Sequence, residues 1–99
     1  MIKLKASISI NDLITIINQI NIIDIRSVQS YNNNHIPNSK NIPFEKLIAN
    51  PSLYLNFSDK YYLYCQKGLS SENVCKILNN IGYNVVNIDG GYESWILYN

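Results

Sequence analysis

The chain has 99 residues, of which 46% are hydrophobic and 15% are charged, and its formal net charge is +1. This length supports one domain around a single core, and this composition is far from that of disordered proteins. The balanced charge gives no electrostatic reason to expect nucleic acid or an acidic membrane as a partner.

No apolar stretch approaches the ~20 residues that span a bilayer, and no secretory pattern follows the first residues. We therefore expect a cytoplasmic protein formed by one domain over residues 1–99. Its two cysteines, Cys65 and Cys75, are too few for a disulfide framework. With a single histidine and no close ligand spacing, we expect no metal site and no cofactor.

The first half of the chain alternates apolar runs with helical patterns. Residues 3–8 read as a strand, and Ser9 and Asp12 then mark a helix start. One face of that helix is apolar, with Leu13, Ile16, Ile17 and Ile20. Further on we expect a buried strand at Ile22–Ile25, a helical turn and loop at Ser27–Asn34, a brief strand at Asn41–Ile42 and a short helix at Phe44–Ile48.

The second half continues the alternation. The apolar run Tyr61–Tyr64 predicts a strand, and the spacing of Val74, Ile77, Leu78 and Ile81 predicts a helix that ends at Gly82. A strand at Val85–Ile88, a turn at Gly90 and Gly91 and a helix at Tyr92–Leu97 complete the pattern. The fold class is therefore α/β, with a central, mainly parallel sheet of about five strands flanked by helices on both faces.

In such a sheet, ligands bind beyond the carboxyl ends of the strands. Three segments are expected to meet there: Asp24 to Arg26, Cys65 with its loop, and Asp89 to Gly91. Cys65 stands between a strand and a helix, where unpaired N–H groups and the helix dipole favour an anion. We expect this arrangement to increase the thiolate fraction of Cys65 and to prepare a sulfur nucleophile.

The residues after Cys65 suit an anionic substrate such as thiosulfate. Gly68 gives the loop the freedom to wrap an anion with N–H groups, and Lys67 adds a mobile positive charge. Ser70 and Ser71 can cap the helix or bind substrate oxygens. The residues alone also allow a plainer interpretation, in which Cys65 is a buried thiol at a strand end and the serines only cap the helix.

Four motifs give a more specific indication. They are Asp24-Ile25-Arg26, Tyr31 to Pro43 with Ile36-Pro37-Asn38-Ser39 and Asn41-Ile42-Pro43, Tyr64 to Ser71, and Gly90-Gly91 followed by Trp95. In their order and spacing the chain resembles the single-domain rhodaneses, a family of sulfurtransferases. The resemblance implies that Cys65 cycles between thiolate and persulfide, and that Gln66, Lys67, Gly68, Leu69, Ser70 and Ser71 form the substrate cradle.

The resemblance further implies a small sulfur donor, thiosulfate or a persulfide, and a thiol, cyanide or protein as acceptor. Many loops of the family carry Arg where this chain has Ser70. Because one hydroxyl replaces a bidentate guanidinium, we predict weak binding of thiosulfate, partly offset by Lys67.

Two other functions use a similar cysteine loop or fold. A phosphatase or arsenate reductase with a related cysteine loop needs an arginine in that loop, and the only arginine is Arg26. A non-catalytic docking or redox-sensing module remains the alternative, with Cys75 as the thiol that could resolve oxidised Cys65. We expect Cys75 otherwise to pack in the core. Asp24, Arg26 and His35 are expected to order the site.

Overall fold

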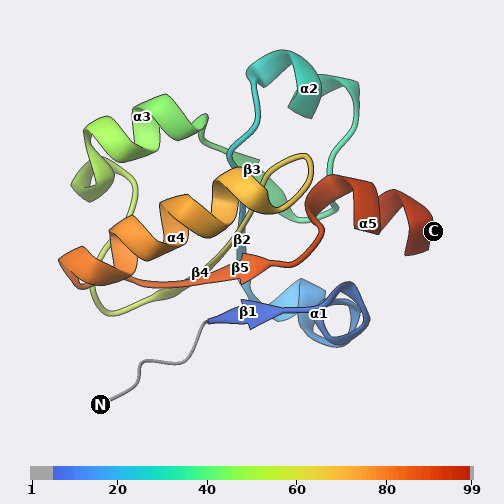
Figure 1. Cartoon of the computed structure of the whole chain (residues 1–99), viewed down its shortest axis with the longest axis horizontal. Helices are drawn as coiled ribbons and strands as arrows, with labels where there is room; N and C mark the ends of the chain where they lie inside the picture. The colour runs from blue at the N-terminus through green and yellow to red at the C-terminus, as the bar shows by residue number, and fades with distance from the viewer. Residues whose placement is uncertain (1–5, 99) are drawn as a thin grey trace.

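The computed structural model describes residues 6–98 of the chain, and these form a five-stranded sheet between two layers of helices (Figure 1). The strands are β1 (Ser7–Ile8), β2 (Asn21–Asp24), β3 (Ser39–Asn41), β4 (Lys60–Tyr64) and β5 (Asn84–Ile88). The α-helices are α1 (Ile10–Ile16), α2 (Val28–Asn33), α3 (Phe44–Ala49), α4 (Leu69–Ile81) and α5 (Gly91–Tyr98). Two 3-10 turns, η1 (Ile17–Gln19) and η2 (Pro51–Leu53), follow α1 and α3.

All four strand pairings are parallel, and the strand order is β1-β5-β4-β2-β3. The expected α/β class with a mainly parallel sheet is therefore confirmed. The chain runs outward from β2 to β3 and then returns across β2 to β4, so the order of the strands reverses between β2 and β4. Ligands bind at such a switch point in open parallel sheets.

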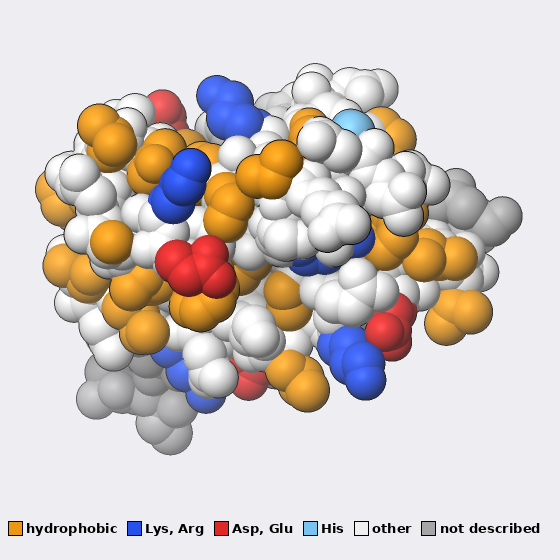
Figure 2. Space-filling model, turned by 90° about the horizontal axis from the view of Figure 1, so that it is seen from above, with side chains coloured by type: hydrophobic (Ala, Val, Ile, Leu, Met, Phe, Trp, Pro, Cys, Tyr) orange, Lys and Arg blue, Asp and Glu red, His pale blue; other side chains and the backbone are white. Residues whose placement is uncertain are grey.

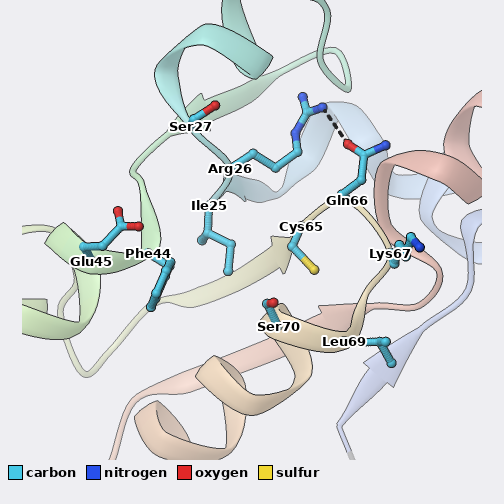
Figure 3. Close-up of a pocket in the computed structure, with 10 residues that line it drawn as sticks. All are labelled: Ile25, Arg26, Ser27, Phe44, Glu45, Cys65, Gln66, Lys67, Leu69 and Ser70. Carbon is cyan, nitrogen blue, oxygen red and sulfur yellow. Dashed lines mark hydrogen bonds between the residues drawn. The ribbon is translucent and has the colours of Figure 1, made fainter.

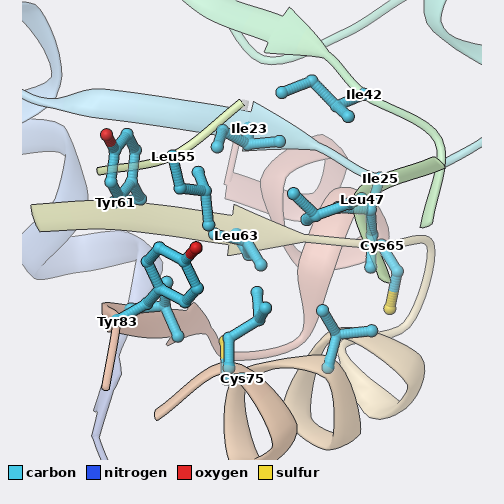
Figure 4. Close-up of a cluster of buried hydrophobic side chains, with 13 residues drawn as sticks. Ile23, Ile25, Ile42, Leu47, Leu55, Tyr61, Leu63, Cys65, Cys75 and Tyr83 are labelled. Carbon is cyan, nitrogen blue, oxygen red and sulfur yellow. The ribbon is translucent and has the colours of Figure 1, made fainter. Parts of the chain in front are cut away.

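Successive side chains of the central strand, β4, point to opposite faces of the sheet and pack in two hydrophobic clusters. Tyr61 and Leu63 of β4 face a cluster that includes Leu47 of α3 and Leu78 of α4, as Figure 4 shows in part. On the other face of the sheet, the second cluster joins residues of β2, β4 and β5 to α1, the loop after α2 and α5; it comprises Ile10, Leu13, Ile22, Ile36, Tyr62, Tyr64, Val86, Ile88 and Tyr92. Helices thus cover both faces, as the alternation of the sequence predicts.

The predicted elements agree with the observed ones except at their ends, and the 3-10 turn η2 was not predicted. The start of the strand expected at residues 3–8 lies outside the described residues, and only Ser7–Ile8 is described as strand. Ser9 caps α1 by accepting from the N–H of Asp12 at 3.2 Å, as expected. The capping role expected of Ser70 and Ser71 is wrong, because α4 starts at Leu69 and its N-cap is Gly68, in the left-handed conformation.

Candidate active site

The centre of the candidate site is the turn between β4 and α4. The Sγ of Cys65 accepts hydrogen bonds from the backbone N–H groups of Gly68 at 3.1 Å and Ser71 at 3.3 Å. Cys65 follows the central strand directly, so its position is set by the sheet, while the two donors belong to the first turn of the helix. Backbone donors held in this way stabilise negative charge on a sulfur atom.

The segment after β5 closes the back of this turn. The N–H of Tyr92 donates to the carbonyl of Cys65 at 2.9 Å, and the N–H of Glu93 donates to the carbonyl of Gln66 at 3.0 Å. Gly91 makes the approach possible, since a Cβ at Gly91 would lie 2.3 Å from the carbonyl oxygen of Cys65. Gly91 also has φ of +59°, which L side chains rarely adopt. The sequence expectation that the Gly90-Gly91 segment meets Cys65 is therefore met.

A pocket of about 430 Å³ opens in front of Cys65 (Figure 3). It lies at the switch point of the sheet, between the chain leaving β2, the start of α3 and the loop leaving β4. Its lining residues are Ile25, Arg26, Ser27, Phe44, Glu45, Cys65, Gln66, Lys67, Leu69 and Ser70. Of the expected cradle, Gly68 and Ser71 do not line the pocket: they lie beneath it, buried against the sulfur.

Three charged side chains line the pocket: Arg26, Glu45 and Lys67. Figure 2, viewed onto the end of the molecule with α2 and α3, shows basic and acidic side chains dispersed, with no large block of one charge. Glu45 and Lys67 are exposed, and the charge of Arg26 is balanced by Asp24 at 2.7 Å. The positive charge available to a donor therefore comes mainly from Lys67 and the N–H groups at the start of α4.

Asp24 and Arg26 form the buried edge of the site. The guanidinium binds both carboxylate oxygens of Asp24, donates to the carbonyl of Asn34 at 2.7 Å and reaches the side-chain oxygen of Gln66 at 3.3 Å. It also lies 4.2 Å above the ring of Tyr92. Burial alone would lower the pKa of Arg26, but the hydrogen bonds and charge of Asp24 outweigh it and the pKa is raised.

Tyr64 completes this network from the central strand. Its hydroxyl donates to Asp24 at 2.6 Å and accepts from the N–H of Ile36 at 3.0 Å. Burial, followed by the hydrogen bond to Asp24, raises the pKa of Tyr64, so this phenol stays neutral. The network connects β2, β4 and the loop after α2 behind the pocket, and it fixes where Arg26 presents its guanidinium.

Sequence reasoning missed Asn87, a buried residue of the site. It lies on β5 with 2% exposure, and its side-chain oxygen accepts from the hydroxyl of Ser71 at 2.5 Å. The Ser71 oxygen lies 3.3 Å from the Sγ of Cys65. The only sequence signal was a polar residue between Val86 and Ile88 in an apolar strand. A buried amide in that position must find partners, and here it finds them beside the cysteine.

His35 and Cys75 lie outside the pocket. The Nδ1 of His35 is 2.8 Å from the carbonyl oxygen of Tyr31, and the two rings are stacked with centroids 3.8 Å apart. Cys75 is buried in the core beneath α4. Burial, and then the charges of Cys65 and Glu72, raise the pKa of Cys75 to about 12, so it stays a thiol at neutral pH.

The described residues 6–98 contain no group of three or more His, Cys, Asp or Glu side chains placed to hold a metal ion. None of the helices in this range is both long and apolar enough to span a membrane.

Residues 9–97 match the family model of the rhodanese-like domain. The chain belongs to the rhodanese-like family. This rhodanese-like domain is also similar to a rhodanese-related protein of Thermoplasma volcanium, with a TM-score of 0.86 and 31% identity over 94% of this chain and 92% of the other.

Curated relatives include proteins with sulfurtransferase names. The domain is 32% identical to the thiosulfate sulfurtransferase GlpE of Shewanella oneidensis, over 89% of each chain. It is 35% identical to the adenylyltransferase and sulfurtransferase uba4 of Ogataea parapolymorpha over 75% of this chain, but over only 19% of that protein. It matches 41% of the putative sulfur carrier protein YrkF of Bacillus subtilis, at 30% identity. It thus spans a minor part of two of these relatives and most of the third.

Proposed function

We propose that this rhodanese-like domain is a sulfurtransferase that carries a sulfane sulfur on Cys65 from a donor such as thiosulfate or a persulfide to a thiol, cyanide or protein acceptor. One observation carries the proposal. Cys65 lines an open pocket, and its sulfur accepts hydrogen bonds from N–H groups of the turn that begins α4. A structural thiol needs neither the pocket nor the donors.

The first step transfers sulfur to the protein. The Cys65 thiolate attacks the outer sulfur of thiosulfate, a sulfur–sulfur bond forms, and the electron pair of the breaking bond leaves with sulfite. The product is a Cys65 persulfide whose terminal sulfur projects into the pocket. The N–H groups of Gly68 and Ser71 offset the negative charge on the cysteine sulfur before attack.

The second step returns the enzyme to its starting state. An acceptor nucleophile attacks the terminal sulfur, and the electron pair of the cleaved sulfur–sulfur bond returns to Cys65 as a thiolate. With cyanide as acceptor the product is thiocyanate. No net oxidant or reductant is consumed, because the sulfane sulfur moves between two nucleophiles.

The remaining pocket residues hold the donor in this proposal. Gln66, Lys67, Leu69 and Ser70 line the pocket into which the terminal sulfur is proposed to project, and Lys67 attracts an anion. Arg26, held from behind by Asp24, lines one side of the pocket and keeps Gln66 in place through the 3.3 Å contact. Glu45, an exposed residue of the pocket lining, repels a dianion, which agrees with the weak thiosulfate binding expected from Ser70.

The relatives support the same class of activity. The GlpE protein of Shewanella oneidensis carries a thiosulfate sulfurtransferase name and matches this chain over almost the whole of both lengths. The putative sulfur carrier protein YrkF suggests that an acceptor could itself be a protein. The cytoplasmic location expected from the sequence stays a prediction.

A docking or redox-sensing module is the second candidate. Two apolar side chains at the pocket, Phe44 and Leu69, are 45% and 70% exposed, as expected of a surface that contacts another protein. Such a module would use the same face without forming a persulfide. A disulfide between Cys65 and Cys75 would mark the sensing role.

Intact-mass measurement tests the proposal. The reduced protein is exposed to thiosulfate or to a small-molecule persulfide, beside the variants Cys65→Ser and Cys75→Ala. We expect a gain of about 32 Da for one added sulfur, lost in C65S, retained in C75A and reversed by cyanide with formation of thiocyanate. No gain with either donor would overturn the sulfurtransferase, and a loss of about 2 Da under mild oxidation would favour sensing.

A further inference from the structure

The side chain of Asn87 has only one orientation that satisfies its neighbours. Its Nδ2 is 3.3 Å from the carbonyl of Gly68 and 3.3 Å from the carboxylate of Asp89, and both of those groups only accept. The amide nitrogen must therefore face them, and the amide oxygen must face Ser71. Since that oxygen cannot donate, the 2.5 Å contact requires Ser71 to donate its hydroxyl proton to Asn87.

This assignment fixes the contact between Ser71 and Cys65. With its proton directed to Asn87, the Ser71 oxygen can only accept from the Cys65 thiol 3.3 Å away. Hydrogen bonds then run in one direction, from Cys65 to Ser71, from Ser71 to Asn87, and from Asn87 to Gly68 and Asp89. This direction suits the protonated form of Cys65.

In the thiolate and the persulfide, a hydrogen bond between Ser71 and Cys65 must run in the opposite direction, from the Ser71 hydroxyl to the sulfur. Neither has a proton on the cysteine sulfur, so a lone pair of the Ser71 oxygen would face an electron-rich sulfur. The hydroxyl can turn its proton to the sulfur only by leaving Asn87. Both side chains are buried, with exposures of 0% for Ser71 and 2% for Asn87, so no bulk water replaces the lost partner.

We propose that Asn87 is a positioning residue that controls the nucleophile through Ser71: it holds the Ser71 hydroxyl proton away from Cys65 in the thiol state and releases it when the sulfur loses its proton. The Ser71 hydroxyl is thus a donor with two positions. On deprotonation the sulfur–hydrogen bond breaks, the proton passes to a base in solution, and the Ser71 proton turns to the sulfur. Asn87 thus controls the same cysteine that carries the proposed function, and the biological meaning of this control rests on that function.

The pH response of Cys65 also depends on other groups around it. Arg26, Glu45 and Lys67 line the pocket, and Asp24 lies behind Arg26. Cys75 and Glu72 lie on α4, Asp89 follows β5, and Tyr92 lies on α5. Substitution of Asn87 leaves all of these groups in place and removes, besides the contact with Ser71, only the hydrogen bonds to Asp89 and to the carbonyl of Gly68. A comparison between wild type and an Asn87 variant therefore measures the effect of the Asn87 amide on Cys65, provided that the effect of Asp89 is measured in a separate variant.

The pH dependence of Cys65 alkylation by iodoacetamide tests the inference, with the modified residue identified by peptide mapping. Asn87→Val keeps a strand-forming residue and removes the acceptor. We expect its alkylation profile to move to lower pH by about half a pH unit to one pH unit, because the freed Ser71 hydroxyl donates to the thiolate. Urea unfolding and circular dichroism check the fold, and Asn87→Ala replaces the valine variant if that one fails to fold.

Two further variants test whether Asn87 acts on Cys65 through Ser71 or through Asp89. In the Ser71→Ala background, Asn87→Val should no longer move the profile, since the hydroxyl that connects the two residues is gone. Asp89→Asn keeps an acceptor for Asn87 but removes the charge, and its profile should move clearly less than that of Asn87→Val. Folded N87V with an unchanged profile, or a shift that persists in S71A, or one that D89N reproduces, would overturn the inference. The alkylation needs no sulfur donor, so this result is separate from a failure of persulfide formation.

Discussion

The hydroxyl of Tyr64 donates to the carboxylate of Asp24 at 2.6 Å, and both residues have 0% exposure. The same hydroxyl accepts from the N–H of Ile36 at 3.0 Å. One phenol oxygen thus connects the central strand to the end of β2 and to the loop after α2. A buried polar network of this kind is stable only while each member keeps its partners.

Tyr64→Phe should therefore destabilise the fold. The variant leaves the N–H of Ile36 without its partner and removes one donor from Asp24, so we expect the free energy of unfolding to fall by about 1–3 kcal/mol. Urea unfolding measures this change. Tyr62→Phe is the matched control, because Tyr62 belongs to the same strand and the same core but its ring faces Lys60. Equal losses of unfolding free energy in the two variants would show that the hydrogen bonds of the Tyr64 hydroxyl do not stabilise the fold.

Cys75 should make the protein less stable in alkali. Burial, and then the charges of Cys65 and Glu72, raise the pKa of Cys75 to about 12, whereas a thiol in an unfolded chain titrates near ~8.5. The raised value means that the folded state keeps the proton which the unfolded chain releases. The stability that the protonated Cys75 thiol contributes to the fold is therefore complete below about pH 8.5, and it is lost as the pH rises toward the pKa of Cys75 in the folded state.

Urea midpoints at several pH values from about 8 to 10 measure this loss in wild type and in Cys75→Ala. The alanine variant leaves a small cavity and is expected to be less stable throughout, but its midpoint should depend less on pH. A slope that is the same in both proteins would show that Cys75 does not cause the alkaline loss.

Gly91→Ala should disable the site more than it disables the fold. The new Cβ would lie 2.3 Å from the carbonyl of Cys65 and 2.8 Å from the N–H nitrogen of Gly68, at a backbone φ of +59°. The cysteine turn or the start of α5 must move, which displaces the donors to the sulfur. We expect persulfide formation, followed by intact mass, to slow by at least about tenfold.

Gly82→Ala is the control for this prediction. Gly82 also has a positive φ, of +114°, but it ends α4 far along the helix from Cys65, and a Cβ there would meet only the ring of Phe57 at 3.4 Å. This variant should lose stability and still form the persulfide at a rate close to that of wild type. Similar slowing in both variants would contradict a local effect of Gly91.

The local patterns in the sequence predicted the elements because each one carries its own periodicity and its own end signal. The apolar run of β4 comes from burial on both faces of the sheet, and the three- and four-residue spacing in α4 comes from burial on one face of the helix. The pairing of Asp24 with Arg26 was also accessible, since the two residues are close in sequence at the end of one strand.

The contacts that cross between elements could not be predicted in this way. Asn87 meets Ser71 because β5 lies beside β4 under the start of α4, and no local pattern specifies that register. The interpretation of Ser70 and Ser71 as caps failed for a related reason. Gly68 in the left-handed conformation turns the chain early, so both serines fall inside the helix and only Ser70 reaches the pocket.

Lys67 should contribute to the binding of an anionic donor. Its side chain is exposed and lines the pocket, where Glu45 carries the opposite charge and the charge of Arg26 is balanced by Asp24. For Lys67→Gln we expect KM for thiosulfate to rise by about two- to tenfold at low salt, with little change in kcat. Lys76→Gln is the control, since Lys76 lies on α4 outside the pocket lining and pairs with Glu72 at 3.8 Å. A KM that is unchanged in K67Q would remove Lys67 from the donor site.

Ser70→Arg should improve the binding of thiosulfate. Ser70 is exposed in the first turn of α4 and lines the pocket, so a longer side chain there can extend toward the donor without displacing the core. A guanidinium offers two parallel N–H groups to an oxyanion, whereas the hydroxyl offers one, so we expect the Kd for thiosulfate to fall by about fivefold or more. Calorimetry in the Cys65→Ser background measures binding alone, because no sulfur can be transferred there. Ser70→Lys adds the same charge without the fork and should gain less. An S70R variant that binds no better than its serine parent would show that the geometry of the loop, rather than the residue at this position, limits donor affinity.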